Sequence, residues 1–171
     1  NNLTEKITIK KLDYRNLSGK FDRVVSIEMI EAVGKKYLKR FIQQCDQLLA
    51  PGGLCFIQAI CIRDQAYAQY QKQVDFIQRY IFPGGFLPCL HALLSLCKSH
   101  TDLQLIHLDN IASDYSLTLK AWQKNLINNQ EDLAQRGYDA LFIRQWQYYL
   151  CYCMAGFNTN RTATYQMLFQ K

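Results

Sequence analysis

Two glutamates, Glu28 and Glu31, stand where a predicted strand gives way to a helix, and carboxylates at such a place can take part in chemistry. The segment at 21–34 reads FDRVVSIEMIEAVG, and its apolar run at 23–27 predicts a strand buried in a parallel sheet. Ligands of open α/β sheets bind at the carboxyl ends of the strands. We therefore expect Glu31 to face a ligand and Glu28 to face a cofactor or solvent. The alternative for Glu31 is a favourable charge against the helix dipole.

Two further side chains could act beside this carboxylate. Gln58 lies on the next predicted strand, LCFIQAI at 54–60, and a glutamine can donate and accept hydrogen bonds but cannot titrate. Tyr115 lies in ASDYSLTLKAW, at the expected start of a helix. The plainer interpretation of Tyr115 is an aromatic ring packed on the core, behind Asp114 as the helix cap.

Composition indicates one domain over residues 1–171, with 49% hydrophobic and 20% charged residues. No apolar run approaches the ~18 residues of a membrane span, and no secretory signal is present, so we expect a cytoplasmic protein. Seven cysteines without a C-x-x-C pair favour reduced thiols. His91, Cys97 and His100 match no metal-ligand spacing, so no metal site is predicted.

The net charge is +6, and part of it gathers on one predicted helix face at Lys35, Lys36, Lys39 and Arg40. A solvated helix face is one interpretation. The other is attraction to anionic lipid at a membrane surface. Nucleic acid is disfavoured as a partner because no nucleic-acid-binding motif accompanies the charge.

Hydrophobic periodicity predicts alternating strands and helices, which is typical of an α/β fold. Strands are expected at 6–12, 24–29, 54–60, 103–108 and 164–169, and helices at 37–49, 64–79, 88–98, 117–128 and 140–155. The helix at 37–49 should end at Pro51-Gly52-Gly53 and should connect two parallel strands. The last two strands should form an antiparallel edge.

The eight glycines include no G-x-G, so the usual glycine-rich cradle for a nucleotide cofactor is not in this chain. Together with YIFPGGFLP at 80–88, the two motifs FDRVVSIEMIEAVG and ASDYSLTLKAW closely resemble the cyclopropane-fatty-acyl-phospholipid synthases. These belong to the mycolic acid cyclopropane synthase family of S-adenosylmethionine-dependent enzymes. The resemblance implies a class I, Rossmann-like methyltransferase sheet that lacks its first strands, as the carboxyl-terminal part of a catalytic domain.

The resemblance also implies an activity. The complete protein would transfer a methyl group from S-adenosylmethionine to the cis double bond of a phospholipid acyl chain, then lose a proton to close a cyclopropane ring. A bicarbonate ion held by Glu31, Tyr115 and the Ile60 backbone would accept that proton. Gln58 stands where the best-known members have histidine. Such an enzyme would work at the inner face of the membrane.

For the cofactor, Leu12, Asp13 and Tyr14 resemble a loop that flanks adenine, and Ile27 ends the neighbouring strand. Asp13 is also an ordinary turn former. The apolar segment at 76–94 is the expected wall for the acyl chain, with ordinary core packing as its alternative.

The strand at 24–29 would lack its usual partner in a chain without the first strands. We therefore expect the strand at 6–12 to dock on it, or two chains to pair edge to edge as a homodimer. Two other functions stay open, a methyltransferase acting on a small amine and a non-catalytic domain that associates with membranes. For Gln58 two outcomes stay open: it lets the intermediate form a methyl-branched or methylene product, or it replaces histidine and the ring closes normally.

Overall fold

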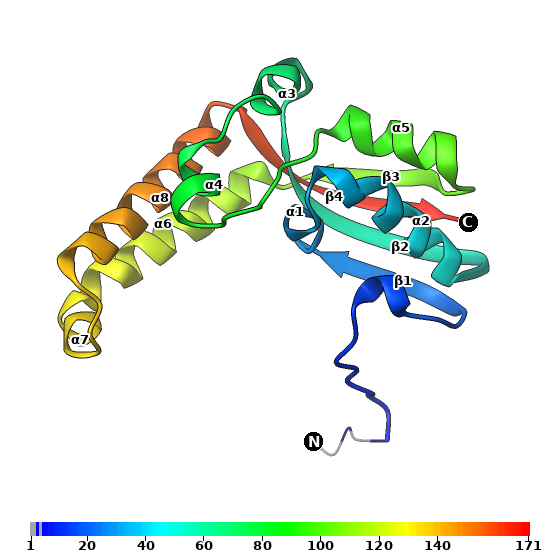
Figure 1. Cartoon of the computed structure of the whole chain (residues 1–171), viewed down its shortest axis with the longest axis horizontal. Helices are drawn as coiled ribbons and strands as arrows, with labels where there is room; N and C mark the ends of the chain where they lie inside the picture. Colours follow the sequence, from blue (N-terminus) through cyan, green and yellow to red (C-terminus); the bar gives the residue numbers. More distant parts are fainter. Residues whose placement is uncertain (1–2, 4) are drawn as a thin grey trace.

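Helices pack on a mixed sheet, as Figure 1 shows for this computed structural model. The structure describes residue 3 and residues 5–171. The strands are β1 (Phe21–Ile27), β2 (Leu49–Ile62), β3 (Gln104–Asn110) and β4 (Thr162–Gln170). The helices are α1 (Ile30–Val33), α2 (Leu38–Leu48), α3 (Asp64–Tyr70), α4 (Phe76–Tyr80), α5 (Leu90–His100), α6 (Ala112–Asn128), α7 (Gln130–Gln135) and α8 (Ala140–Asn158). Two 3-10 turns, η1 (Tyr14–Asn16) and η2 (Lys35–Tyr37), precede β1 and α2.

The sheet has the strand order β1-β2-β4-β3. β1 and β2 run parallel and α2 lies between them in the chain, which confirms the predicted strand–helix–strand unit. β4 runs antiparallel to both of its neighbours, β2 and β3. The predicted antiparallel edge is therefore confirmed, with β3 as the outer strand.

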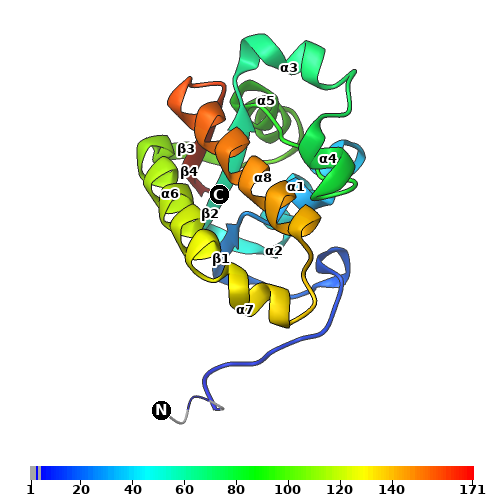
Figure 2. The same cartoon turned by 90° about the vertical axis from the view of Figure 1, so that its left-hand side faces the viewer.

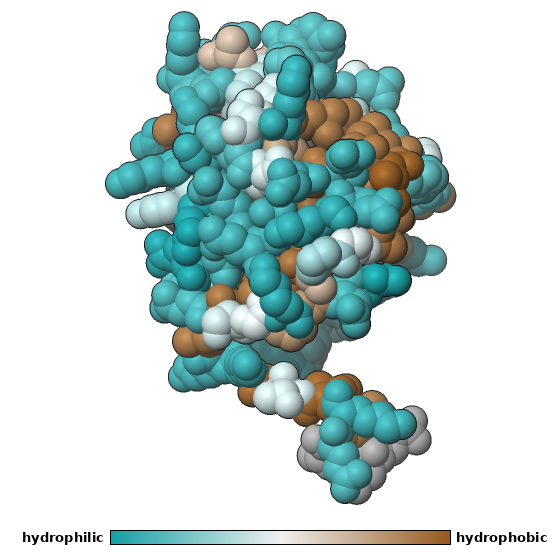
Figure 3. Space-filling model, turned by 90° about the vertical axis from the view of Figure 1, so that its right-hand side faces the viewer, coloured by the Kyte–Doolittle hydropathy of each residue, from teal (hydrophilic) through white to brown (hydrophobic). Residues whose placement is uncertain are grey.

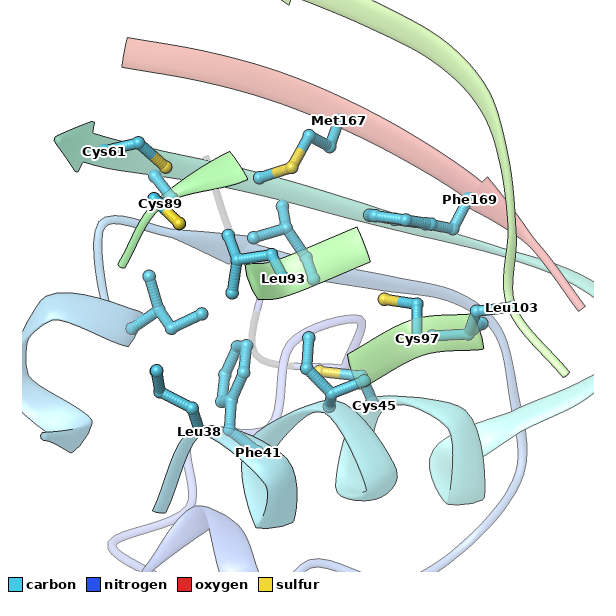
Figure 4. Close-up of a cluster of buried hydrophobic side chains, with 14 of the residues drawn as sticks. Leu38, Phe41, Cys45, Cys61, Cys89, Leu93, Cys97, Leu103, Met167 and Phe169 are labelled. Carbon is cyan, nitrogen blue, oxygen red and sulfur yellow. The ribbon is translucent and has the colours of Figure 1, made fainter. Parts of the chain in front are cut away.

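The main hydrophobic core lies between one face of the sheet and helices α2 and α5 (Figures 1 and 4). Alternate side chains of β2 enter this core, because successive residues of a strand point to opposite faces. They are Cys55, Ile57, Ala59 and Cys61, each at most 1% exposed. Phe41 from α2 and Leu93 from α5 also enter the core, and full burial of such side chains stabilises the fold by about 1.5–3 kcal/mol each.

The opposite face of the sheet carries α6 and α8, which form an antiparallel pair at one end of the molecule (Figures 1 and 2). A smaller core joins the two helices and contains Ala112, Leu119, Leu150 and Phe157. Ile60, near the end of β2, packs against this core. The helix pair therefore sits where the parallel strands finish.

The prediction of a strand at 6–12 is wrong, because this segment extends away from the sheet (Figure 1). Ile9 within it is 92% exposed. Alternating apolar and polar residues suit a strand, but a strand also needs a neighbour for its backbone hydrogen bonds. Docking of this segment on β1 is wrong for the same reason. Edge-to-edge pairing of two chains stays a prediction.

The expectation that β1 is buried on both faces is also wrong. Ser26 is its one buried residue, whereas Val25 is 63% and Ile27 59% exposed. β1 is an edge strand with helices on one face, so its apolar composition did not imply a central position. Apolar side chains are exposed on the other edge strand too, at Leu105, Ile106 and Leu108. Seen from the end opposite the α6–α8 pair, the surface is mainly hydrophilic, and its largest apolar area lies at the upper right (Figure 3).

Residues 64–79 form two helices, α3 and α4, where one was predicted. Asp75 starts α4 with a reciprocal pair of hydrogen bonds. Its side chain accepts from the Gln78 N–H at 2.9 Å, and its own N–H donates to the Gln78 side chain at 3.0 Å. Such a capping box begins a new helix. Pro51-Gly52-Gly53 lies within β2, and α2 ends before it at Leu48.

The basic residues predicted to share a helix face are all exposed. They lie on η2 and α2 and are Lys35, Lys36, Lys39 and Arg40. All seven cysteines are free, and five of them are buried. Within the described part of the chain, no helix combines the length and the apolar character needed to cross a membrane.

Candidate active site

A carboxylate cluster forms at the carboxyl end of β1, where the backbone turns sharply at Glu28. Glu28 has a φ of 51°, in the left-handed region that residues with a β-carbon rarely adopt. Its N–H donates to the Gln58 carbonyl oxygen at 2.9 Å, which extends the β1–β2 pairing by one bond. The turn directs the side chain to groups on β2 and α6. These contacts were not expected from the sequence, and whether Glu28 also faces the cofactor stays a prediction.

Both carboxylate oxygens of Glu28 accept hydrogen bonds from side chains. Gln58 Nε2, on β2, donates to Oε1 at 2.9 Å. The Tyr115 hydroxyl, on α6, donates to Oε2 at 2.8 Å. Hydrogen bonds to an ionised acceptor are roughly twice as strong as those between neutral groups. Three elements far apart in the sequence thus meet at one carboxylate.

The orientation of the Gln58 amide is set by β4. Gln58 pairs with Gln166 in the β2–β4 register, and Gln166 Nε2 donates to Gln58 Oε1 at 2.9 Å. Since the oxygen of the amide is occupied on that side, its nitrogen is turned toward Glu28. Gln166 therefore positions Gln58 from the neighbouring strand.

Glu31 lies in the first turn of α1 and reaches the backbone of β2. Its Oε1 accepts a hydrogen bond from the Ile60 N–H at 2.6 Å. Its Oε2 is buried, and no described group forms a hydrogen bond with it. Burial raises the pKa of Glu31, the Ile60 hydrogen bond opposes that rise, and the charge of Glu28 adds to it. Glu31 therefore holds a proton to higher pH than an ordinary glutamate.

Tyr115 is held by ring packing as well as by its hydrogen bond. Its ring stacks on Phe157 with centroids 4.9 Å apart and meets Trp122 edge-on at 6.5 Å. Burial and the bond to Glu28 raise the pKa of Tyr115, so the hydroxyl stays a donor at neutral pH. The core-packing interpretation of Tyr115 is correct, and it accompanies the contact with Glu28. Asp114 is not the helix cap, because α6 starts earlier, with Ile111 as its N-cap and Asp114 in its first turn.

The predicted cofactor residues lie around η1 and at the end of β1. The side chain of Asp13 caps η1 and binds Arg15, with 2.7 Å between Oδ2 and Nη2, which lowers the pKa of Asp13 to about 2. The buried Tyr14 hydroxyl makes no hydrogen bond to any described group. Leu12 is 51% and Ile27 59% exposed, so both can contact a ligand. Cofactor binding by these residues stays a prediction.

All of the predicted catalytic residues join the cluster, namely Glu31, Gln58, Ile60 and Tyr115. Their roles stay predictions. Sequence reasoning missed Glu28 as the centre of the cluster, although its position at a strand end was a signal. It also missed Gln166, which only the register of β4 against β2 reveals. Among the described residues, no group of three potential metal ligands lies close together.

Comparison with known proteins identifies relatives over nearly the whole chain. The mycolic acid cyclopropane synthetase family model matches residues 1–167. Tuberculostearic acid methyltransferase UfaA1 of Mycobacterium tuberculosis is 37% identical over 161 residues, which are 94% of this chain and 38% of that protein. Cyclopropane-fatty-acyl-phospholipid synthase of Escherichia coli is 31% identical over 96% of this chain and 41% of that protein. The chain thus spans less than half the length of these curated relatives.

Solved structures establish the fold. The mycolic acid cyclopropane synthase CmaA1, crystallised with SAH and CTAB, superposes with a TM-score of 0.80 at 22% identity, over 92% of this chain and 58% of that chain. The cyclopropane synthase MmaA2 of Mycobacterium tuberculosis gives 0.83 at 19% identity, over 98% and 64% of the two chains. The predicted class I methyltransferase fold is therefore confirmed. With a family model that matches almost every residue, this chain belongs to the mycolic acid cyclopropane synthetase family.

Proposed function

We propose that the complete protein carrying these residues transfers a methyl group from S-adenosylmethionine to the cis double bond of a phospholipid acyl chain and closes a cyclopropane ring. The main support is the carboxylate cluster at the end of β1. Glu31 meets the Ile60 backbone at 2.6 Å, and Tyr115 reaches the adjacent Glu28 at 2.8 Å. The crevice at the strand ends is where an α/β sheet binds its ligands. Residues 1–171 would form the carboxyl-terminal part of the catalytic domain.

The cofactor proposal is supported by the fold and by the CmaA1 structure, which is a complex with SAH. S-adenosylmethionine supplies an electrophilic methyl group on a sulfonium. Leu12 and Ile27 are exposed apolar side chains, and the buried Tyr14 hydroxyl has no hydrogen-bond partner among the described residues. These groups could contact the adenosine part, while the Glu28 carboxylate favours the cationic sulfonium by simple electrostatics.

A lipid substrate is supported by the relatives, which include a fatty-acyl-phospholipid synthase. The predicted acyl-chain wall at 76–94 divides into two parts. Its later part is core, since Phe86 and Leu93 are buried. Its earlier part faces the aromatic side chains of α8, with Phe76 and Tyr148 centroids 4.6 Å apart and Phe82 and Tyr149 centroids 5.8 Å apart. We therefore assign the acyl-chain wall to the aromatic side chains by which α4 and the loop after it contact α8.

Access to a phospholipid requires contact with a bilayer at its surface. The exposed cations at the start of α2 could provide that contact, at about 1 kcal/mol for each residue near an anionic surface. This arrangement corresponds to a peripheral protein at the inner face of the membrane.

The bicarbonate ion implied by the resemblance does not fit the groups present. The Ile60 N–H already donates to Glu31, and Tyr115 and Gln58 already donate to Glu28. A further anion about 4 Å from an ionised carboxylate would be repelled by about 4 kcal/mol at an effective dielectric constant of about 20. We therefore assign no step to bicarbonate.

Expression of the complete protein in a bacterium that makes no cyclopropane lipids tests the proposed function. Mass spectrometry of the extracted phospholipids should show acyl chains enlarged by one CH2 unit. The matched control is the Glu31→Gln variant, which should give far less of this product. Unchanged lipids together with methylation of an added small amine would support the amine methyltransferase instead.

A further inference from the structure

We propose that Glu28 is the proton acceptor of the reaction and occupies the place of an external bicarbonate ion. This inference rests on the proposed function, since it concerns the proton lost after methyl transfer. It adds a catalytic residue to those expected from the sequence. The groups predicted to hold a free anion bind carboxylates of the chain itself.

The hydrogen bonds account for every donor of the expected anion site. Gln58 Nε2 and the Tyr115 hydroxyl donate to the two oxygens of Glu28, at 2.9 and 2.8 Å. The Ile60 N–H donates to Glu31 at 2.6 Å. A deprotonated carboxylate only accepts hydrogen bonds, and here its neighbours are donors. The arrangement therefore matches that of a bound anion, except that the anion belongs to the chain.

The backbone of Glu28 supports the same conclusion. Its φ of 51° is costly for any residue other than glycine. The surrounding contacts nevertheless hold a glutamate there, since its N–H bonds to the Gln58 carbonyl and its side chain has two donors. Gln166 holds the Gln58 amide in the required orientation. A glycine at this position would relieve the backbone and remove the carboxylate at once.

The proton balance of the step is simple. The alkene attacks the methyl carbon, the bond from that carbon to sulfur breaks, and the neighbouring acyl carbon becomes a cation. A C–H bond of the new methyl group then gives its electron pair to that cation to close the ring. The proton passes to the Glu28 carboxylate, which becomes a carboxylic acid and later releases the proton to water. Glu28 is half-buried, so part of its side chain stays accessible.

Two substitutions at Glu28 distinguish an internal proton acceptor from an external one. Glu28→Gln keeps the size of the side chain and removes its basicity. Glu28→Gly removes the side chain, suits the left-handed backbone and opens space for a small anion. Glu131→Gln, on exposed α7, is the matched control that removes one surface carboxylate.

The assay measures turnover of the complete protein in bicarbonate-free buffer and after addition of sodium bicarbonate. The unchanged protein and Glu131→Gln should be equally active in both. Glu28→Gln should lose about 10²- to 10⁴-fold in turnover, as expected for a lost general base, and bicarbonate should not restore it. Addition of bicarbonate should raise the turnover of Glu28→Gly at least about 10-fold, because the ion would supply the missing base.

A binding measurement gives a second readout that needs no turnover. Carbon-13 NMR with labelled bicarbonate should show binding to the Glu28→Gly protein and none to the unchanged protein. Bicarbonate binding by the unchanged protein, or its dependence on bicarbonate for turnover, would overturn the inference and leave the proposed function intact. Equal behaviour of Glu28→Gly and unchanged protein would also overturn it. If bicarbonate binds only to Glu28→Gly but no lipid is methylated, the proposed function fails while the anion assignment stands.

Discussion

Removal of the Tyr115 hydroxyl tests whether its contact with Glu28 acts in the reaction or only in the fold. Tyr115→Phe deletes a 2.8 Å hydrogen bond to a carboxylate and keeps the ring that stacks on Phe157 at 4.9 Å. A hydrogen bond to a charged group contributes about 1.5–3 kcal/mol. If that contribution is made mainly in the transition state, turnover should fall about 10- to 100-fold.

The assay compares kcat, the dissociation constant of S-adenosylmethionine and the melting temperature for the complete protein and its Tyr115→Phe variant. Cofactor affinity should be unchanged, and the melting temperature should shift by only a few degrees because the ring packing is kept. Tyr138→Phe is a suitable control, since Tyr138 is 43% exposed and lies outside the cluster. Unchanged kcat, or a loss confined to cofactor binding, would refute the role given to Tyr115.

Glu31→Gln should lower turnover and leave cofactor affinity nearly intact. Burial raises the Glu31 pKa above its ordinary 4.5, so the folded state binds this proton more tightly than the unfolded state does. The free energy of unfolding should therefore fall as pH rises from 4.5 through the raised pKa, and denaturation of the Glu31→Gln variant should lack this fall. The 171-residue chain alone, which has no G-x-G turn, should not bind S-adenosylmethionine in calorimetry, and a micromolar dissociation constant would show that the cofactor site is misplaced. Gln58→His should change the ratio of cyclopropane to methylene or methyl-branched lipids, whereas identical, purely cyclopropane products from both proteins would make Gln58 a simple substitute for histidine.

The meeting of the candidate site residues could be predicted because strand ends determine where side chains meet in this fold class. Glu31 comes just after β1, and Ile60 lies on β2, the parallel neighbour of β1. Their contact can therefore be expected from that topology. The contacts of Glu28 could not be predicted, because the direction of its side chain depends on a left-handed φ that no residue pattern indicates for a glutamate. Gln166 lies on the last strand, and its contact with Gln58 depends on a register that spans more than a hundred residues of sequence.

The errors in the fold have one physical origin, which is that local pattern does not reveal partners. The alternating segment at 6–12 has the composition of a strand and no neighbour to pair with. β1 has the composition of a central strand and lies at an edge. Conversely, the α2, α5 and α8 helices were predicted to within a few residues, because their apolar faces match the sheet or the neighbouring helix that they cover.

Transfer of deuterium from labelled S-adenosylmethionine tests the central claim most directly. The complete protein would be incubated with S-adenosylmethionine carrying a fully deuterated methyl group and with vesicles of a phospholipid that has cis-monounsaturated chains. Mass spectrometry should find the label in the acyl chain as a CD2 unit, one deuterium having been lost as the ring closes, and Glu28→Gln should greatly slow its appearance. Label absent from the acyl chain would contradict the account, and so would label that enters it equally fast in the unchanged protein and in Glu28→Gln.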